Sequence, residues 1–155
     1  MNDLKVWQGK TDPEKFYVVE YDETLKALIA EVVNGESPLL DTTLVQRVSR
    51  AHGFNRAGRL IRERVMEIVD DHYHVATDHS GEDFVWLSEA QRTDWNSFRL
   101  PATDYDVRQV DAIPSEELRA LALSLEGTNK ISEMASSLGI KRLTSQARQR
   151  LELVL

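Results

Sequence analysis

Residues 50–69 read RAHGFNRAGRLIRERVMEIV, and this stretch decides the fold because a glycine turn separates two helical segments within it. The helix before the turn is predicted from Asp41 or Thr42 to Gly53, with Leu44, Val45 and Val48 at helical spacing. The helix after it is predicted over about 56–69. Helix, glycine turn and helix is the order of a helix-turn-helix unit.

The flanking sequence supplies the other elements of such a unit. Residues 21–33 have helical periodicity with Asp22 as the expected N-cap, and NGESP at 34–38 is expected to break that helix. A short strand is predicted at FYVVE, residues 16–20. The β-prone runs HYHVAT and DFVWLS are joined by DHSGE at 78–82, which predicts a hairpin, or wing. Phe84 and Trp86 share one strand face, which we expect to pack on the helices; stacking on bases is the alternative.

The end of the chain repeats this region. A shift of 86 residues places GFNRAGRLIRERVMEIV on GIKRLTSQARQRLELVL, which aligns Gly53 with Gly139 and Arg64 with Arg150. The repeat indicates two related helical units. We therefore predict a mainly α protein with a small β-hairpin (α+β), a winged helix-turn-helix followed by a second helix-turn-helix-like unit. The predicted parts are an N-terminal extension (1–20), the winged domain (21–90), an extended linker with a possible strand (91–113) and a helical repeat packed on the first unit (114–155).

Charge is distributed unevenly along the chain. The 155 residues carry a formal net charge of -7, yet residues 46–64 hold six arginines and one glutamate, so the remainder carries -12. A negative total disfavours indiscriminate binding to nucleic acid or anionic membranes. There is no cysteine for a disulfide or a thiolate metal site, and we find no apolar run long enough for a membrane span or signal peptide. We expect a cytoplasmic protein with no membrane contact.

A helical wheel divides the arginines of residues 56–69 into two groups. Arg64 falls in the apolar arc of Ala57, Leu60, Ile61, Val65 and Ile68, so Arg64 and its repeat partner Arg150 are predicted to be structural, with carboxylate or carbonyl partners. Arg56, Arg59 and Arg62 fall on the opposite face. With Arg50, they are the predicted contacts to nucleic acid; an ordinary solvated face or a protein contact is the alternative.

Signatures of catalysis are weak. The chain lacks a phosphate-binding loop and the carboxylate and lysine spacing of a metal-dependent nuclease. His72 and His74, two apart on a predicted strand, suggest a metal site only weakly, and whether they bind metal stays open. We predict no enzymatic activity, no cofactor and no metal.

The run Gly-Phe-x-Arg-Ala-Gly-x-x-Ile-Arg-Glu-Arg at 53–64, with GEDFVWL and VDAIPSEELRALAL, resembles domain-of-unknown-function family 3320 over roughly residues 20–155. The second copy departs from the pattern, with Thr144 in place of Gly58 and Gln149 in place of Glu63. The resemblance implies a C-terminal module of large bacterial superfamily I helicase and Vsr-like nuclease proteins. The expected function is an accessory role in DNA processing, possibly in defence, through the second helix of the helix-turn-helix. The alternative is a docking module that scaffolds the helicase or nuclease domains without touching DNA.

Overall fold

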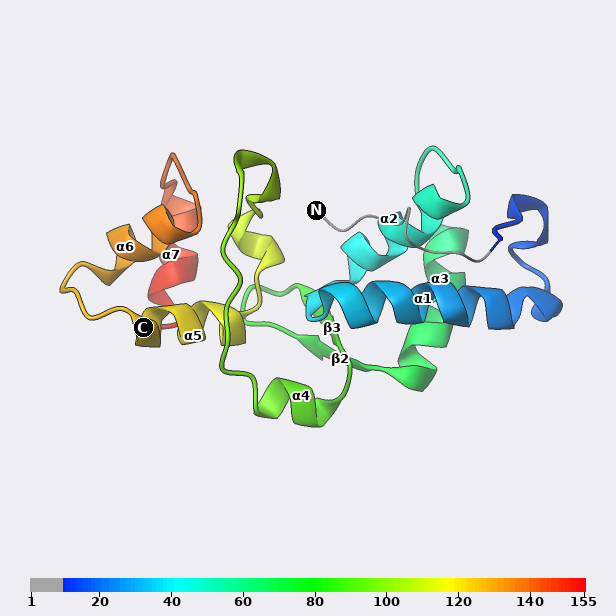
Figure 1. The fold of residues 1–155 in the computed structure, drawn as a ribbon, viewed down its shortest axis with the longest axis horizontal. Coiled ribbons are helices and arrows are strands. Elements are labelled where there is room, and N and C mark those ends of the chain that lie inside the picture. Colours follow the sequence, from blue (N-terminus) through cyan, green and yellow to red (C-terminus); the bar gives the residue numbers. More distant parts are fainter. Residues whose placement is uncertain (1–9) are drawn as a thin grey trace. The chain divides into compact units, whose positions relative to one another are not determined.

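The computed structural model describes residues 10–155, which divide into two compact units (Figure 1). The N-terminal unit extends to Ala76 and includes Asp83–Glu89, and the C-terminal unit comprises Thr77–Glu82 and Ala90–Leu155. Residues 1–9 of the predicted N-terminal extension lie outside the described residues. No helix in the described part of the chain is long and apolar enough to cross a membrane.

The N-terminal unit contains three helices and a small sheet. Its elements, in chain order, are α1 (Asp22–Glu36), β1 (Leu39–Leu40), α2 (Asp41–Ala51), α3 (Arg59–His72), β2 (His74–Thr77) and β3 (Asp83–Trp86). The sheet has the order β1-β3-β2, and β1 pairs antiparallel with β3 through Leu39 with Val85 and Leu40 with Phe84. The mainly helical α+β class and the hairpin are confirmed, whereas β1 was not predicted.

The C-terminal unit is helical. It contains the short helix α4 (Glu89–Thr93), which begins at the unit boundary, and then α5 (Ser115–Ser124), α6 (Lys130–Ser137) and α7 (Ser145–Glu152). Single 3-10 turns at Asp104–Asp106 and Val110–Ala112 interrupt the segment between α4 and α5, where no strand forms. Leu118, Leu121, Met134, Leu138 and Leu151 are buried in the core of this unit.

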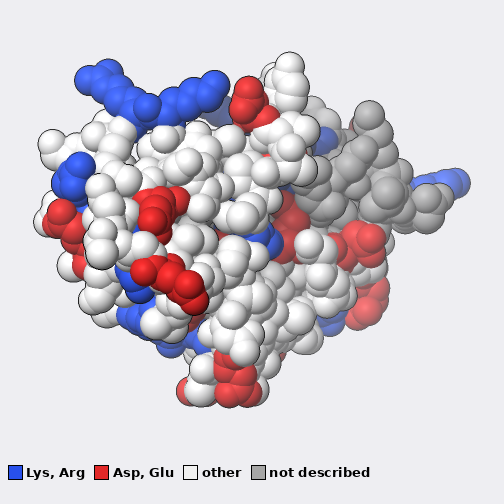
Figure 2. Space-filling model, turned by 60° about the vertical axis from the view of Figure 1, so that its left-hand side comes forward, with Lys and Arg blue, Asp and Glu red and all other residues white. Residues whose placement is uncertain are grey.

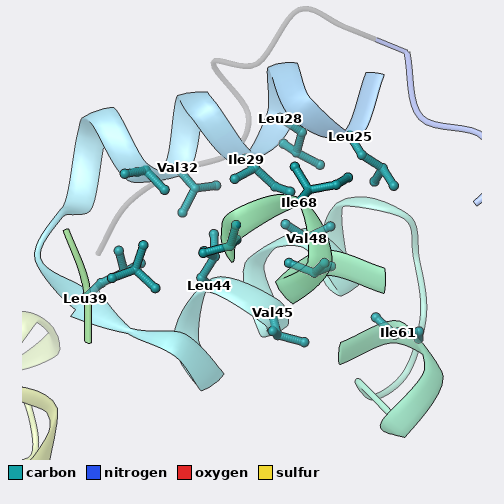
Figure 3. Close-up of a cluster of buried hydrophobic side chains, with 14 of the residues drawn as sticks. Leu25, Leu28, Ile29, Val32, Leu39, Leu44, Val45, Val48, Ile61 and Ile68 are labelled. Carbon is teal, nitrogen blue, oxygen red and sulfur yellow. The ribbon is translucent and has the colours of Figure 1, made fainter. Parts of the chain in front are cut away.

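Apolar faces of α1, α2 and α3 form the core of the N-terminal unit (Figure 3). The labelled side chains of α1 point toward those of α2 and α3. They are Leu25, Leu28, Ile29 and Val32 from α1, Leu44, Val45 and Val48 from α2, and Ile61 and Ile68 from α3. Truncating one such side chain to alanine typically costs about 2–5 kcal/mol. Because the apolar face of α3 is buried in this core, the opposite face of the helix points toward solvent.

The strand predicted at residues 16–20 was wrong. Phe16 and Tyr17 lie in a turn, and Val19–Tyr21 form a single 3-10 turn that leads into α1. The carbonyl oxygens of Phe16 and Val18 accept hydrogen bonds from the Arg64 guanidinium instead of from a neighbouring strand. Phe16 is fully buried, so this one side chain anchors the segment without a sheet.

The ends of α1 also differ from the prediction. Tyr21, not Asp22, occupies the N-cap position, and its side chain makes no capping hydrogen bond. The helix continues through Asn34 and Gly35 and ends only at Glu36. Ser37 is extended (φ -65°, ψ 145°) because a residue before proline avoids the α conformation, so Pro38 stops the helix.

Helix α3 begins three residues later than predicted. Gly58 is extended at its N-cap (φ -81°, ψ -177°), so Arg56 and Ala57 precede the helix. At the other end the helix runs through His72, which separates His72 from His74 in β2 and makes the prediction that both lie on one strand wrong. Leu60, placed in the apolar arc by the wheel, is 57% exposed.

Strand β3 turns a different face to the helices than expected. Val85 belongs to the core cluster of α1, α2 and α3, whereas Phe84 and Trp86, on the opposite face of the strand, do not. Both aromatic side chains are nevertheless 1% exposed. Their burial favours a packing role over base stacking.

Candidate nucleic-acid interface

The turn between α2 and α3 places basic side chains on the surface. Gly53 has a φ of 78°, a conformation that favours glycine, and its N–H donates to the carbonyl oxygen of Arg50 at 2.9 Å. Arg50, in the last turn of α2, and Arg56, in the segment before α3, are exposed. Neither forms an ion pair with any residue in the range 10–155, so both guanidinium groups are available to a ligand.

Arg59, the first residue of α3, has a weak partner. Its guanidinium lies 2.8 Å from Glu63 one turn along the helix, and the two side chains are 76% and 58% exposed. An exposed pair of this spacing contributes about 0.3–0.5 kcal/mol. A phosphate group can therefore replace Glu63 at small cost.

Arg62 is engaged more firmly, although the wheel places it on the outward face. It forms an ion pair with Asp41, the first residue of α2, whose side chain is only 6% exposed. The same carboxylate accepts a hydrogen bond from the Thr42 N–H at 2.7 Å. A ligand that takes Arg62 would leave a nearly buried carboxylate without its cation, which is costly. Nucleic-acid contact by Arg62 stays a prediction with this structural competitor.

Arg64 reaches back to the segment before α1. Its Nε donates to the Phe16 carbonyl oxygen at 3.1 Å, its Nη2 donates to the Val18 carbonyl oxygen at 3.0 Å, and it also pairs with the Asp22 carboxylate. The side chain is 13% exposed. These contacts are of the kind expected for a structural arginine; its contribution to stability stays a prediction.

Arg150 makes the corresponding contacts in the C-terminal unit. Its guanidinium lies 2.8 Å from Asp78 and donates to the Ile113 carbonyl oxygen at 2.7 Å and to the Ser115 hydroxyl at 2.9 Å. Asp78 in turn accepts from the Ser115 N–H at 2.8 Å, which caps α5 in place of Pro114. Burial acts to raise the pKa of Asp78, but hydrogen bonds from Ser115 and Ser80 and the Arg150 charge outweigh it, and the pKa is lowered.

Sequence reasoning missed a buried carboxylate in α5. The Glu117 side chain is 1% exposed and is held by two arginines of the segment before α5. Arg99 Nε lies 2.8 Å from Glu117, and Arg108 pairs with the other carboxylate oxygen while donating to the Arg99 carbonyl oxygen at 2.9 Å. These partners are 18 and 9 residues from Glu117, and no local pattern marks them.

A buried histidine was also missed. His52 is 4% exposed, and its Nδ1 lies 2.8 Å from the Val48 carbonyl oxygen, which only accepts. Nδ1 therefore carries the proton, and Nε2 accepts from the Tyr21 hydroxyl at 2.6 Å. That hydroxyl accepts a hydrogen bond from the Asp12 N–H at 2.8 Å, so the Tyr21 hydroxyl proton is directed toward His52 Nε2. Burial lowers the pKa of His52, so the imidazole is neutral at pH 7.

Other chemistry is sparse in the described part of the chain. Within residues 10–155, no group of three histidine or acidic side chains is arranged to hold a metal ion. On the face drawn in Figure 2, acidic side chains lie among basic ones, and basic side chains project together at its upper edge.

Comparison with known proteins gives one finding. Residues 14–63 match the model of the family described as "Protein of unknown function (DUF3320)". The match covers α1, β1, α2, the turn and the first residues of α3, which is less than half of the chain. No curated protein and no solved structure has a significant match. The family match supports the resemblance over residues 14–63.

Proposed function

We propose that the chain is a non-catalytic nucleic-acid-binding module of a DNA-processing protein, with the N-terminal unit acting as a winged helix-turn-helix. The element order α1, β1, α2, α3, β2, β3 and the pairing of β1 with β3 support this interpretation. In such units the second helix of the helix-turn-helix approaches the major groove. The helicase or nuclease context follows from the family resemblance and is part of the proposal.

The observation that carries the proposal is the exposure of arginines around the turn. Arg50 and Arg56 have no ion-pair partner among residues 10–155, and Arg59 has only the exposed Glu63. They lie at the end of α2, in the turn and at the start of α3, the positions from which a helix-turn-helix contacts phosphate and base edges. Guanidinium groups suit both phosphates and guanine.

The hairpin loop contributes little to this surface. The Asp78 carboxylate accepts a hydrogen bond from Ser115 and forms an ion pair with Arg150, and these contacts fix the first residue of the loop. The carboxylates of Glu82, in the loop, and of Asp83, the first residue of β3, repel phosphate. We therefore propose that helix α3 and its turn carry the binding, with modest affinity that depends strongly on salt because the whole chain is negatively charged.

Fluorescence anisotropy with a labelled mixed-sequence DNA duplex and a single strand tests the proposal. The wild-type chain is expected to bind at about 50 mM salt and to weaken steeply by about 200 mM. The triple variant Arg50→Ala, Arg56→Ala, Arg59→Ala is expected to bind at least tenfold more weakly, since about three phosphate contacts are lost. A matched control removes three charges elsewhere, at Lys10, Lys15 and Arg119, which are exposed. Equal loss in both variants, or no binding at low salt, contradicts the proposal.

A docking function is the second candidate, and a specific observation favours it. Tyr17, Val18 and Val19 are consecutive and are 54%, 41% and 75% exposed. Three adjacent exposed apolar residues suit a protein surface. If the chain does not bind nucleic acid, a helicase or nuclease domain of the same longer protein becomes the preferred partner, and Val19→Asp is the variant expected to weaken that contact.

A further inference from the structure

The C-terminal unit repeats the turn geometry of the N-terminal unit in detail. Gly139 has a φ of 77°, against 78° for Gly53. The Ile140 N–H donates to Ala135 at 2.9 Å, as the Phe54 N–H donates to Ser49 at 3.2 Å, and these pairs are related by the shift of 86 residues. The turn between α6 and α7 therefore repeats the turn between α2 and α3 in its backbone geometry as well as in its sequence.

The inward faces of the second helices also correspond. Ile61, Val65 and Ile68 of α3 are buried, and the aligned Ala147, Leu151 and Val154 are buried as well. Arg64 and Arg150 each join a carboxylate to a main-chain carbonyl oxygen shortly before a helix, α1 in one unit and α5 in the other. Since the inward faces match, the outward faces of α3 and α7 occupy equivalent positions in their units.

The outward face of the second copy is the less neutralised of the two. Residues 141–151 read KRLTSQARQRL and contain no acidic residue, whereas the first copy has Glu63, where the second has Gln149. Lys141, Arg142 and Arg148 are exposed, and Arg150 is already paired. Three cations of this turn and helix are thus exposed. The acidic residue of α7 is Glu152 at its last position, one turn after Arg148, and no ion pair joins the two among residues 10–155.

Arg148 illustrates the difference most clearly. Its aligned residue, Arg62, pairs with Asp41, but the residue aligned with Asp41 is Gly127. The nearby Glu133 carboxylate lies against Gly127, at the place a Cβ would occupy, and forms no ion pair with Arg148. The cation that the first unit uses for its own fold is therefore free of ion pairs in the second unit, as far as residues 10–155 show.

Opposing charges at the turn are few. Lys141 lies 3.9 Å from Asp104, and the two side chains are 83% and 85% exposed, so solvent screens this pair. Asp104 and Asp111 also line a hollow of about 420 Å³ beside the turn, together with Lys141 and Arg142. These carboxylates disfavour an anion inside the hollow, whereas the Lys141 and Arg142 side chains are exposed to solvent and can contact phosphates outside it.

We propose that the α6–α7 helix-turn-helix is a second nucleic-acid-binding site, in which Lys141, Arg142 and Arg148 contact phosphates of the backbone. This inference deepens the proposed function and rests on it. The second copy departs from the family pattern at Thr144 and Gln149, yet its cations remain exposed. The loss of the glutamate removes a repelling charge from the phosphate-facing surface.

The test compares salt dependence in four proteins: the whole wild-type chain, the N-terminal triple variant at Arg50, Arg56 and Arg59, a C-terminal triple variant (Lys141→Ala, Arg142→Ala, Arg148→Ala) and a control variant. The probe is the labelled mixed-sequence duplex. The C-terminal variant is expected to lower the magnitude of the log-log salt slope by about 2.7, because each lost phosphate contact removes about 0.9. The Lys10, Lys15, Arg119 variant is the control for loss of charge.

The possible results separate the two proposals. If the C-terminal variant loses slope and the control does not, the second site is supported. If the chain binds and only the N-terminal variant is affected, the proposed function stands and the second site is overturned. If the wild-type chain fails to bind at low salt, both proposals fall. Circular dichroism and thermal unfolding of each variant exclude misfolding, which is not expected because all the replaced side chains are exposed.

Discussion

The carboxylate of Asp78, in the β2–β3 loop, lies 2.8 Å from the guanidinium of Arg150 in α7, and each side chain is 4% exposed. Seventy-two positions of sequence separate the two residues. Ser115 joins the pair, since it donates its N–H and hydroxyl to Asp78 and accepts from Arg150. One buried cluster thus ties the hairpin loop, the start of α5 and the end of α7 together within the C-terminal unit.

Removing Arg150 is expected to destabilise the protein strongly. Arg150→Ala leaves Asp78 buried without its cation, and breaking such a pair costs about 3–5 kcal/mol. Arg148→Ala, two residues away on the exposed side of α7, is the matched control and is expected to change stability by less than about 0.5 kcal/mol. Urea denaturation measures both. Similar free energies of unfolding for the two variants would contradict a structural role for Arg150.

Arg64→Ala is also expected to lower the free energy of unfolding more than an exposed control variant does, by a smaller amount than Arg150→Ala. Arg64→Ala removes two hydrogen bonds to main-chain carbonyl oxygens and the pair with Asp22, and hydrogen bonds to charged groups contribute about 1.5–3 kcal/mol. Arg59→Ala removes only the exposed pair with Glu63 and is expected to be nearly neutral. Thermal melting of the two variants measures this difference. Equal melting temperatures for Arg64→Ala and Arg59→Ala would contradict a structural role for Arg64.

His52 is expected to make the fold sensitive to mild acid. Burial lowers its pKa in the folded state below the ordinary value of 6.5, so the unfolded state takes up a proton first as pH falls. The stability that depends on neutral His52 is present above pH 6.5 and is lost as pH falls below it. His52→Gln should flatten the plot of unfolding free energy against pH in this range, whereas His79→Gln, at an exposed loop position, should not. If the pH profile of the unfolding free energy is the same in His52→Gln as in the wild-type chain, His52 is not the source of the acid sensitivity.

The two turn glycines should respond unequally to alanine. Gly53→Ala places a side chain at positive φ with open space around it, which costs about 1–2 kcal/mol. Gly139→Ala adds a clash, because the new Cβ would lie 2.8 Å from Val107 Cγ2. Adding Val107→Ala to Gly139→Ala should recover part of the loss. Equal costs at the two glycines, with no recovery, would argue against the close contact.

Local sequence patterns predicted the elements whose formation depends mainly on their own residues. The spacing of Leu44, Val45 and Val48 predicted α2, Gly53 predicted its end, and Gly81 predicted the hairpin loop. The strand β1 has two residues and exists only through its pairing with β3, so no periodicity announces it. FYVVE has strand-like composition, but its carbonyl groups are taken by Arg64, 46–48 residues away in sequence.

The partners of the charged groups were beyond sequence reasoning for the same reason. The wheel placed Arg64 and Arg59 on different faces of the helix, and their side chains are 13% and 76% exposed, but it could not supply Asp41 for Arg62 or Asp78 for Arg150. Those carboxylates lie on other elements, and their distances follow from tertiary packing. The repeat is visible in the sequence. Which cations of α7 are exposed and which are paired could be found only from the structure, because Arg150 is paired with Asp78 whereas Arg148 is exposed.

The most direct test of the two proposed nucleic-acid-binding sites is a map of amide chemical-shift changes over the whole chain during titration with a short mixed-sequence DNA duplex. The changes are predicted to gather at residues 50–59 and 141–148, with the buried core residues of both units little affected. Changes confined to 17–19, or an unperturbed spectrum at low salt, would contradict nucleic-acid binding by the two helix-turn-helix turns.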